Sequence, residues 1–465
     1  MASQEMRLER DSMGELEVPI NAYYGGNTRR AELNFPISNL RLGRSFIKAI
    51  GQIKQSAAVV NLQLGEIDKK IANAIIDASQ RVIDGEFDDQ FVVDVFQTGS
   101  GTSTNMNSNE VISNIAIESL GGELGSRSPV HPNDHVNKGQ SSNDVFPSTI
   151  HLAAAVAIKD SLIPALNELE DSLRKKSDEF WEVVKTGRTH LQDATPIRLG
   201  QEFLGYAGQI EFASKRAEKA LAELSVLALG GTAVGTGIGM HPEFATRVIN
   251  RLREMTGVNL SETTNHFQAQ STLDAAVAAS GELKSIAVGM MKISNDLRWL
   301  GSGPRAGIGE ISLPEVQPGS SIMPGKVNPV IAESVTMVSA QVIGNDTTIS
   351  IAGQSGNFEL NVMMPVAAHN LLESIDLLAS AAVNLARQCI NGLIATDKGP
   401  AMVMQGLAIC TALAPIIGYD AAAGIAHNAA ETGETIKEVA LRVTDLNEVQ
   451  LDEILEPLSM TEPKA

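Results

Sequence analysis

Residues 319–329, Gly-Ser-Ser-Ile-Met-Pro-Gly-Lys-Val-Asn-Pro, combine several groups that can bind an anion. The glycines and prolines favour a turn, and two serines and Lys326 supply hydrogen-bond donors. Asn328 followed by Pro329 is typical of a helix start, with asparagine as N-cap and proline at the first helical position. Because a helix N-terminus carries partial positive charge, the segment predicts an anion-binding loop. A glycine-rich connector that contains a lysine is the alternative.

His190 is the natural candidate for proton transfer among the eight histidines. It lies between Arg188 and Asp193 in a polar segment, and an imidazole titrates close to neutral pH. A hydrogen-bonded loop histidine without a catalytic role fits the same local sequence. Glu333 is expected in the first turns of the helix that begins near Asn328, where its carboxylate could face a histidine from another segment. Carboxylates at helix starts are commonly structural, which is the alternative for Glu333.

Three further polar loops are predicted to precede helices in the same way. Residues 100–107 precede a helix from about Asn105, residues 141–144 open a helix from 142, and residues 189–196 open another with Thr195 as N-cap. Each loop taken alone is explained by capping. Taken together, helix N-termini with hydroxyl and amide side chains are what recognition of a small dianion would use.

The remaining motifs favour no other chemistry. Residues 230–239 are glycine-rich, but they follow a predicted helix and contain no Gly-Lys-Ser/Thr sequence, so they predict a flexible connector and not a nucleotide-binding loop. No group of histidines, cysteines or carboxylates has the spacing of a metal site, and no metal or cofactor is expected. Cys389 and Cys410 lie in apolar helical stretches and are expected to be buried thiols.

The composition predicts a large helical core. Hydrophobic residues make up 43% of the 465 residues but aromatic residues only 4%, which suits long helices that pack closely. The formal net charge of −19 argues against a nucleic acid or an anionic membrane as partner. The N-terminal segment, residues 1–15, has no signal or transit pattern, and no uninterrupted apolar run has the length of a membrane span. We therefore expect a soluble, cytoplasmic protein.

Helical periodicity predicts the elements that must position these residues. Two helices are expected within residues 38–85, and several longer ones follow, each exceeding the usual length of about 11–12 residues. Some of the long helices are apolar on more than one face, which indicates burial against other subunits in a homo-oligomer. We expect an all-α protein with a mostly helical N-terminal domain (1–140), a central long-helix bundle (141–396) and a small C-terminal helical domain (397–465). The long helices are predicted at residues 142–180 with a bend at Pro164, 196–229, 268–300, 329–352 and 362–393.

The loop at residues 319–328 resembles the signature of the fumarase/aspartase superfamily, and further motifs resemble class II fumarases in order along almost the whole chain. Arg7, Glu9 and residues 11–14 resemble the N-terminus of that family, as do residues 23–36. The other matching segments are Gln97-Thr-Gly-Ser-Gly-Thr102 with Asn105-Met-Asn107, Val130-His-Pro-Asn-Asp134, Gln140-Ser-Ser-Asn-Asp144, Gly187-Arg-Thr-His-Leu-Gln-Asp193 and Gly356-Asn-Phe-Glu-Leu-Asn361.

The resemblance implies reversible hydration of fumarate to L-malate without a metal or cofactor. Ser320 would be the base that removes the C3 proton of malate, and His190 the partner acid and base, oriented by Glu333. The resemblance also implies an all-α fold whose central five-helix bundle tetramerises into a twenty-helix core, with active sites shared among three subunits. A secondary dicarboxylate site corresponds to His131, Pro132, Asn133 and Asp134. The expected substrate ligands are Ser100, Gly101, Thr102, Ser141, Ser142, Asn143, Thr189, Ser321, Lys326, Val327 and Asn328.

Two other functions fit parts of the sequence. Aspartase, which eliminates ammonia from aspartate, is a sister of fumarase, but it typically has glutamine in place of His190 and Ser-Thr-Asn-Asp in place of residues 141–144. A catalytically silent helical scaffold is the other alternative, because lens crystallins have been recruited from the same superfamily. The intact Ser320, His190 and Lys326 argue against a scaffold.

Overall fold

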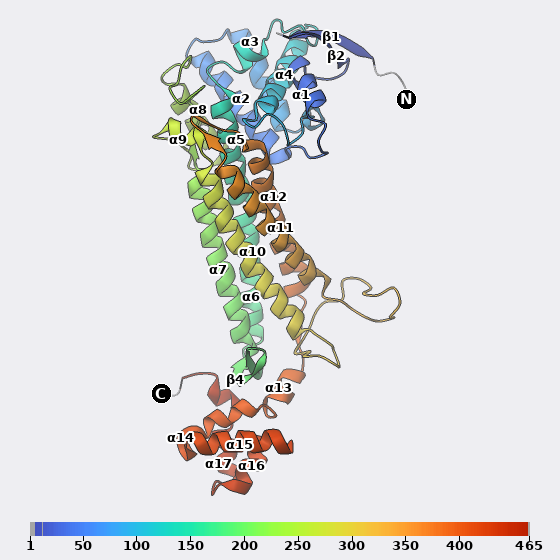
Figure 1. The fold of residues 1–465 in the computed structure, drawn as a ribbon, viewed down its shortest axis with the longest axis vertical. Helices are drawn as coiled ribbons and strands as arrows, with labels where there is room; N and C mark the ends of the chain where they lie inside the picture. Colours follow the sequence, from blue (N-terminus) through green and yellow to red (C-terminus); the bar gives the residue numbers. More distant parts are fainter. Residues whose placement is uncertain (1–4, 12, 464–465) are drawn as a thin grey trace. The chain divides into compact units, whose positions relative to one another are not determined.

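The computed structural model describes residues 5–11 and 13–463, and helices form most of this part of the chain (Figure 1). Its strands pair into five two-stranded sheets, so the prediction of an all-α protein is confirmed in its main feature. Ser12, part of the sequence motif at residues 11–14, lies outside the described residues. Residues 1–4, part of the N-terminal segment without a signal or transit pattern, also lie outside them. The chain divides into unit 1 (Met1–Pro164, Lys215–Ala287 and Ala340–Ala379) and unit 2 (Ala165–Ser214, Val288–Ser339 and Ser380–Ala465).

In unit 1, helix α2 (Arg44–Gln63) lies within a cluster of helices that pack against it. Its side chains Phe46, Ile50 and Ile53 are completely buried, and the ring of Phe46 lies 4.9 Å from the ring of Phe146. The two helices predicted within residues 38–85 are α2 and α3, so that prediction is confirmed, whereas α8 was not predicted. The helices packed on α2 are α3 (Lys69–Ile83), α4 (Thr102–Ser119), α5 (Ser142–Ala157) and α8 (Phe244–Thr256).

Helix α5 continues into α6 (Ile163–Glu179) through a π-helical turn at Ile158–Leu162. Pro164 follows this turn, and a proline inside a helix has no N–H to donate and crowds the preceding turn. A π-helical turn relieves that crowding because its hydrogen bonds span five residues and its backbone is wider than that of an α-helix. A π-turn thus ends two residues before Pro164, and the bend predicted at that proline stays a prediction.

The other predicted long helices are also present, with changed ends. The helix expected over 268–300 is divided, because Thr272 is extended (φ −126°, ψ 166°) and separates two helices. The helix expected from Pro196 begins later, after a strand. Residues of α7, α10, α11 and α12 belong to both units. The bounds are α7 (Leu199–Leu224), α9 (His266–Ser271), α10 (Asp274–Leu300), α11 (Val330–Gly353) and α12 (Met364–Leu385), which the π-turn Ala386–Ile390 extends.

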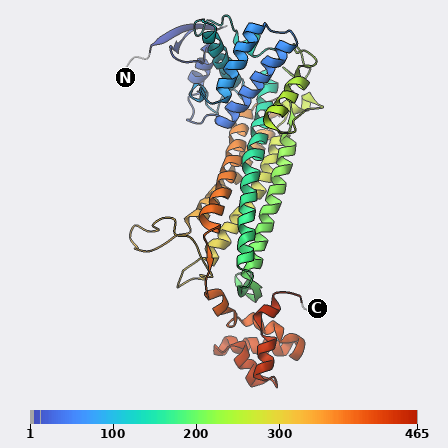
Figure 2. The same cartoon turned by 180° about the vertical axis from the view of Figure 1, so that it is seen from behind.

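Short helices occupy the C-terminal part of unit 2, as predicted (Figure 2). They share a small apolar core that includes Ile425, Val439 and Leu451. Thr435 begins one of these helices with a reciprocal capping box, and Gly433 ends the preceding one in a left-handed conformation at φ +76°. Local sequence therefore fixes these boundaries well. The elements are α13 (Lys398–Val403), η5 (Leu407–Ala412), α14 (Ala414–Ile417), α15 (Tyr419–Thr432), α16 (Ile436–Val443), α17 (Glu448–Ile454) and η6 (Pro457–Met460).

Short strands were largely missed by sequence patterning. The pairs are antiparallel except β5–β6, which is parallel. The strands β5 to β10 have two residues each and are too short for an alternating apolar pattern to identify them, and the longer β3 and β4 contain few apolar residues. The strands are β1 (Met6–Asp11), β2 (Gly14–Pro19), β3 (Val184–Thr189), β4 (Gln192–Arg198), β5 (Val226–Leu227), β6 (Ser261–Glu262), β7 (Ile311–Ser312), β8 (Gly356–Asn357), β9 (Leu360–Asn361) and β10 (Ile394–Ala395).

Two helical stretches, Ser142–Glu179 and Met364–Ile390, are long and apolar enough to cross a membrane when polar interruptions are allowed. Of their most apolar windows, 61% and 56% of the residues are buried inside the protein. Core helices have this character, because their apolar side chains pack against other helices and not against lipid.

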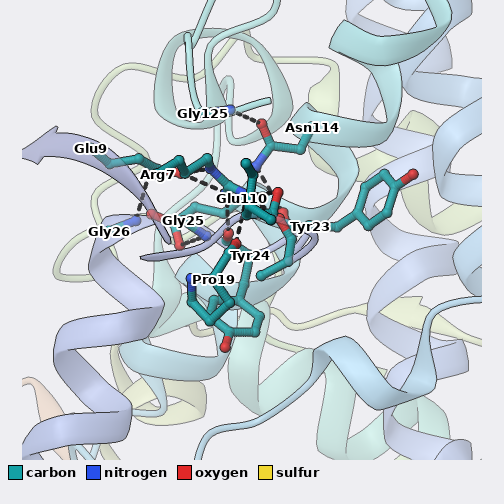
Figure 3. Close-up of polar contacts among 12 residues, drawn as sticks. Arg7, Glu9, Pro19, Tyr23, Tyr24, Gly25, Gly26, Glu110, Asn114 and Gly125 are labelled. Atoms are coloured by element: carbon teal, nitrogen blue, oxygen red, sulfur yellow. Dashed lines mark hydrogen bonds and ion pairs between the residues drawn. The ribbon is translucent and has the colours of Figure 1, made fainter. Parts of the chain in front are cut away.

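The N-terminal segment is fixed by two buried carboxylates, Glu9 and Glu110 (Figure 3). Helix α1 (Gly26–Asn34) begins beside them, and its first N–H groups have no partner within the helix. Glu9 accepts from the N–H of Gly26 at 2.8 Å, and Glu110 accepts from the N–H groups of Gly25, Asn27 and Thr28 at 2.9–3.1 Å. A Cβ at Gly25 would lie 2.9–3.1 Å from the two carboxylates.

Arg7 completes this network from strand β1. Its guanidinium pairs with Glu9 at 2.6 Å and donates to the carbonyl groups of Pro19 and Tyr24 (Figure 3). The β1–β2 hairpin is therefore joined to α1 and α4 by charge-assisted hydrogen bonds, which are stronger than neutral ones.

Replacing Glu110 by alanine should lower the free energy of unfolding by about 3 kcal/mol, because the buried N–H groups at the start of α1 lose their acceptor. Urea denaturation of the purified protein measures this change. The matched control is Glu118→Ala on the same helix, where an exposed carboxylate accepts from the Tyr23 hydroxyl, and it should cost less than about 1 kcal/mol. Equal losses in the two variants would contradict the capping role of Glu110.

Candidate active site

His190 lies at the tip of the hairpin formed by β3 and β4. Thr189 pairs with Gln192, so His190 and Leu191 form a two-residue turn, and both have positive φ angles of 56° and 60°. Two-residue hairpin turns of this kind normally contain asparagine or glycine, because other side chains are strained there. Such strain is tolerated where the surrounding structure enforces it, often at functional sites. His190 is therefore exposed to solvent at the end of a short hairpin with a fixed register.

This hairpin corrects the prediction that residues 189–196 open a helix. Thr195 and Pro196 are in strand β4, and α7 begins at Leu199. Pro196 has no N–H and is compatible with a strand that has a neighbour on one side alone. Thr189, a predicted substrate ligand, is exposed at the end of β3 and is not at a helix N-terminus.

A buried group of charged side chains anchors the base of the hairpin. Lys185 and Glu310 are each 1% exposed and lie 3.1 Å apart. Glu310 also accepts from Arg188 at 2.8 Å, and Lys185 also pairs with Glu202 at 2.8 Å. The carboxylate of Glu310 is the main cause of the raised pKa of Arg188, whereas burial raises the pKa of Glu202. Removing one member would leave a buried charge without its partner, so the cluster holds β3 firmly in place.

A cavity of about 780 Å³ extends along the same hairpin, and Thr189 and Arg188 are among its lining residues. Its cationic groups are already paired with carboxylates, Arg188 with Glu310 and Lys292 with Asp296 at 2.5 Å. The cavity therefore supplies little free positive charge for an anion.

The loop at residues 319–329 has the turn structure that its glycines and prolines predict. The Oγ atom of Ser320 accepts hydrogen bonds from the backbone N–H groups of Ile322 at 3.2 Å and Met323 at 2.9 Å. A Cβ at Gly319 would lie 2.2 Å from the carbonyl oxygen of Lys326, so the two ends of the loop approach too closely for any other residue. The predicted ligands Ser321, Lys326 and Val327 are exposed on this loop.

Asn328 does not cap α11 as predicted, because the helix begins at Val330 and the side-chain NH₂ of Asn328 donates to the carbonyl oxygen of Gly319. The asparagine thus closes the loop across its two ends. Glu333 lies in the first turn of α11, as predicted. Among the described residues no hydrogen bond joins Glu333 to His190, so the chain by itself does not form that predicted pair.

The other predicted ligands lie in unit 1 and come together at the starts of α4 and α5. Ser100 and Thr102 share a hydrogen bond of 2.8 Å between their hydroxyl groups on either side of Gly101, which has φ +74°. A Cβ at Gly101 would lie 2.1 Å from the ring of Phe146, so this turn packs directly on α5. Helix α4 begins at Thr102, three residues before the predicted start at Asn105.

The start of α5 agrees with prediction. Ser141 is its N-cap and forms a capping box with Asp144, which satisfies the first N–H groups of the helix. Ser142 accepts a hydrogen bond of 3.0 Å from the side-chain NH₂ of Asn105, and this bond connects α5 to α4. Asn143 donates to the carbonyl oxygen of Ala233 in the glycine-rich loop. The loop at residues 230–239 is therefore attached to the start of α5, as an inter-helix connector could be.

The predicted secondary site at residues 131–134 forms a local turn. Nδ1 of His131 accepts from the backbone N–H groups of Asn133 at 3.3 Å and Asp134 at 3.1 Å. The Asp134 carboxylate lies 3.2 Å from the same nitrogen, but a nitrogen that accepts two N–H groups does not carry the proton of an ion pair. Pro132 is buried, whereas Asn133 and Asp134 are exposed. Nδ1 of His131 is therefore engaged in the turn itself.

Lys54 was not identified from the sequence. It is completely buried on α2, and its ammonium donates to the side-chain oxygens of Asn137 and Gln140 at 2.9 Å each. Burial lowers its pKa to about 7, opposed by the charge of Asp144. The sequence feature that could have identified Lys54 is its position four residues after Ile50, which places a lysine on the apolar face of a predicted helix.

The arrangement agrees with what comparison with known proteins finds. A family model described as "Lyase" matches residues 14–344, and one described as "Fumarase C C-terminus" matches residues 409–462. The fold and the site therefore define a lyase built from long helices, with a small C-terminal helical part.

Individual relatives are more specific. The chain is 50% identical to "Fumarate hydratase class II" of Methylorubrum extorquens, covering 100% of this chain and 98% of that protein. It is 49% identical to "Fumarate hydratase, mitochondrial" of Homo sapiens, covering 100% and 92%. The crystal structure of class II fumarase from Schistosoma mansoni matches with a TM-score of 0.96 and 38% identity over 99% of this chain and 100% of that one. The chain belongs to the class II fumarate hydratase family.

Replacing Lys54 by methionine should change how stability depends on pH. With a pKa near 7 in the folded protein and 10.5 as the ordinary value, the folded form releases this proton at a lower pH than the unfolded chain. The cost of burying the charge is complete below about pH 7 and declines above it, so this group makes the wild type more stable as pH rises. The advantage of Lys54→Met over the wild type should therefore shrink between about pH 7 and about pH 9.

Urea denaturation across this pH range measures the effect. Lys48→Met is the matched control, because Lys48 is an exposed lysine on the same helix, and its difference from the wild type should stay constant. A constant difference for Lys54→Met would show that the buried amine does not titrate there.

Proposed function

We propose that this protein catalyses the reversible hydration of fumarate to L-malate. The observation that carries this proposal is the similarity to class II fumarate hydratases over the full length of the chain. The hydroxyl, amide and lysine groups at the described loops suit a small dianion, which the overall negative charge of the chain would otherwise repel.

In the proposed reaction, the Oγ atom of Ser320 removes the C3 proton of L-malate. The electron pair of that C–H bond moves onto the adjacent carboxylate, which becomes a doubly negative aci-carboxylate. The C2 hydroxyl then leaves as water after it receives a proton from His190, and the C2–C3 double bond of fumarate forms. Hydration follows the same steps in reverse. Lys326 and Asn328 would stabilise the aci-carboxylate, which carries more charge than the ground state.

Ser320 must become basic enough for this step, because a free hydroxyl is a poor base near neutral pH. The two N–H groups that donate to its Oγ atom support the role, since hydrogen bonds to a developing alkoxide favour the charged form. Gly319 and Gly325, which has φ +79°, allow the tight turn that directs these N–H groups toward one oxygen.

The substrate carboxylates would bind to Ser100, Thr102, Ser141, Ser142 and Asn143, with Gly101 as the turn residue between the first two. These residues lie at the starts of α4 and α5, where partial positive charge favours anions. Thr189, Ser321 and Val327 would complete the pocket. The turn at residues 131–134 would hold a second dicarboxylate.

We further propose a homotetramer in which three subunits contribute to each active site. Ser320, Lys326 and Glu333 belong to unit 2, whereas Ser100 and Ser142 belong to unit 1. Large apolar side chains are exposed on long helices, such as Val288 at 53% and Met337 at 66%, and other copies of the chain would cover them. A cytoplasmic location, without nucleic acid or membrane as partner, agrees with the acidic chain.

The first test follows the ultraviolet absorbance of the fumarate double bond with purified protein. Absorbance should rise with L-malate, unaffected by a chelator, and should stay constant with aspartate. Ser320→Ala should lower kcat by about 10²–10⁴-fold, as loss of a general base does. Ser459→Ala, which removes a hydroxyl from the C-terminal helical part, should leave kcat unchanged. A rise with aspartate alone would establish an ammonia-lyase.

The second test addresses shared active sites by mixing two inactive variants. Ser320→Ala lacks the unit 2 base, and Asn143→Ala lacks a unit 1 ligand. After co-expression, roughly a quarter of the sites in mixed tetramers would combine an intact residue from each chain, so activity should return. If each site were built from one chain, every site would carry a defect and the mixture would stay inactive.

A further inference from the structure

A buried hydrogen-bond chain leads from Lys54 to the start of α5. The ammonium of Lys54 donates to Oδ1 of Asn137 at 2.9 Å. The same oxygen accepts from the side-chain NH₂ groups of Asn105 and Asn109 at 3.2 Å each. Asn105 then donates to Oγ of Ser142 at 3.0 Å. All the links lie in unit 1, and Lys54, Asn105 and Asn109 are at most 1% exposed.

The direction of this chain is fixed at one end. A protonated lysine has three donors and no acceptor, so the atoms that face it must be the oxygens of Asn137 and Gln140. With its oxygen facing Lys54, Asn137 can accept from its neighbours but cannot donate from that atom. Asn105 and Asn109 must consequently present their NH₂ groups to Asn137. The side-chain amides of Asn137, Asn105 and Asn109 therefore each have one favoured orientation, because exchanging oxygen and NH₂ would break these hydrogen bonds.

The fixed direction decides what Ser142 offers. Because Asn105 donates to its Oγ atom, one lone pair of Ser142 is occupied and its hydroxyl hydrogen is free to point elsewhere. A substrate carboxylate accepts hydrogen bonds and cannot donate them. Ser142 is therefore oriented as a donor by Asn105, and the orientation of Asn105 is determined by Lys54 through Asn137.

We propose that Lys54 is a positioning residue for substrate binding, which orients the Asn137–Asn105 amide chain so that Ser142 donates its hydroxyl hydrogen to a substrate carboxylate. This role rests on the proposed function, because it concerns the same carboxylate site. Lys54 acts through Asn137 and Asn105 and does not contact the substrate.

Two further observations support this role. The Oδ1 atoms of Asn105 and Asn109 are buried without a hydrogen-bond partner among the described residues. If the side-chain amide of Asn105 or Asn109 rotated by 180°, its Oδ1 atom would leave the present unpartnered position. That oxygen would then face the side-chain oxygen of Asn137, and two acceptors cannot form a hydrogen bond. The free-energy cost of a buried oxygen without a hydrogen bond persists where another residue enforces the orientation of the amide. Lys54 is that residue, because even its neutral amine has donors enough for Asn137 and Gln140.

The opposing charge lies at the same helix start. Asp144 is completely buried and accepts from the N–H groups of Gly230 and Thr232 at 3.0 Å each. The negative charge of Asp144 favours the protonated form of Lys54. The hydrogen bonds of Asp144 join the start of α5 to the loop at residues 230–232.

The experiment compares the wild type with Lys54→Met, which keeps the volume of the side chain but removes its donors. KM for L-malate should rise about tenfold, as loss of one hydrogen bond to a charged group does, and kcat should change less than about threefold. The free energy of unfolding should stay equal or increase, because replacing a buried charge by an apolar side chain is commonly neutral or stabilising. Lys48→Met on the same helix should change neither KM nor kcat.

A second variant, Asn105→Leu, interrupts the chain beyond Lys54. It should raise KM by a similar factor, and the double variant should show no further rise, because both changes interrupt the same chain to Ser142. If Lys54→Met does not fold, Asn105→Leu alone decides, and an unchanged KM then overturns the proposal. A wild type without activity on L-malate overturns the proposed function and this role with it. An active wild type with an unchanged KM in Lys54→Met, or additive effects in the double variant, overturns this role alone.

Discussion

The buried carboxylate of Asp144 is the interaction on which the proposed substrate pocket depends most. Desolvation raises the pKa of this group, and three backbone N–H groups, those of Ser141, Gly230 and Thr232, stabilise its charged form. A charge without such partners would be far too costly inside a protein. Satisfying it requires that the start of α5 and the glycine-rich loop after residue 229 take up one arrangement, and the charge of Lys54 on α2 favours the ionised carboxylate. The same arrangement fixes the helix start that carries Ser141, Ser142 and Asn143.

Helix starts serve two purposes in this chain. At α1 the first N–H groups are satisfied by the protein's own carboxylates, Glu9 and Glu110, so no anion-binding capacity remains there. At α4 and α5 the helix starts carry hydroxyl and amide side chains, which can donate to an external carboxylate. The difference matters because the chain has a net charge of −19 and a dianion must find local positive potential. At α5 an internal carboxylate, that of Asp144, also reaches the helix start, but the hydroxyl group of Ser142 remains there to donate to an external anion.

The two turns that carry candidate catalytic groups are tightly constrained. His190 and Leu191 both have positive φ angles at a hairpin tip, and Gly319 lies so close to the carbonyl group of Lys326 that no side chain fits. The positive φ angles of the hairpin cost conformational free energy. The hairpin is held by the buried cluster of Lys185 and Glu310, and the loop is held by the Asn328 side chain. A fixed position for these groups agrees with the proposed active site that several subunits share.

Sequence alone determined the helical class, the long helices, the short C-terminal helices and the motifs that carry the candidate residues. These follow from local properties, namely 3.6-residue periodicity, caps and turn residues. The tertiary structure decided three features that depend on partners distant in sequence. Residues 184–198 became a hairpin because strand pairing and the contact of Lys185 with Glu310 outweigh the helix-start signal of Thr195 and Pro196. Asn328 closes a loop onto Gly319, and Lys54 became the buried origin of a polar chain, because only packing determines which groups face each other across a core.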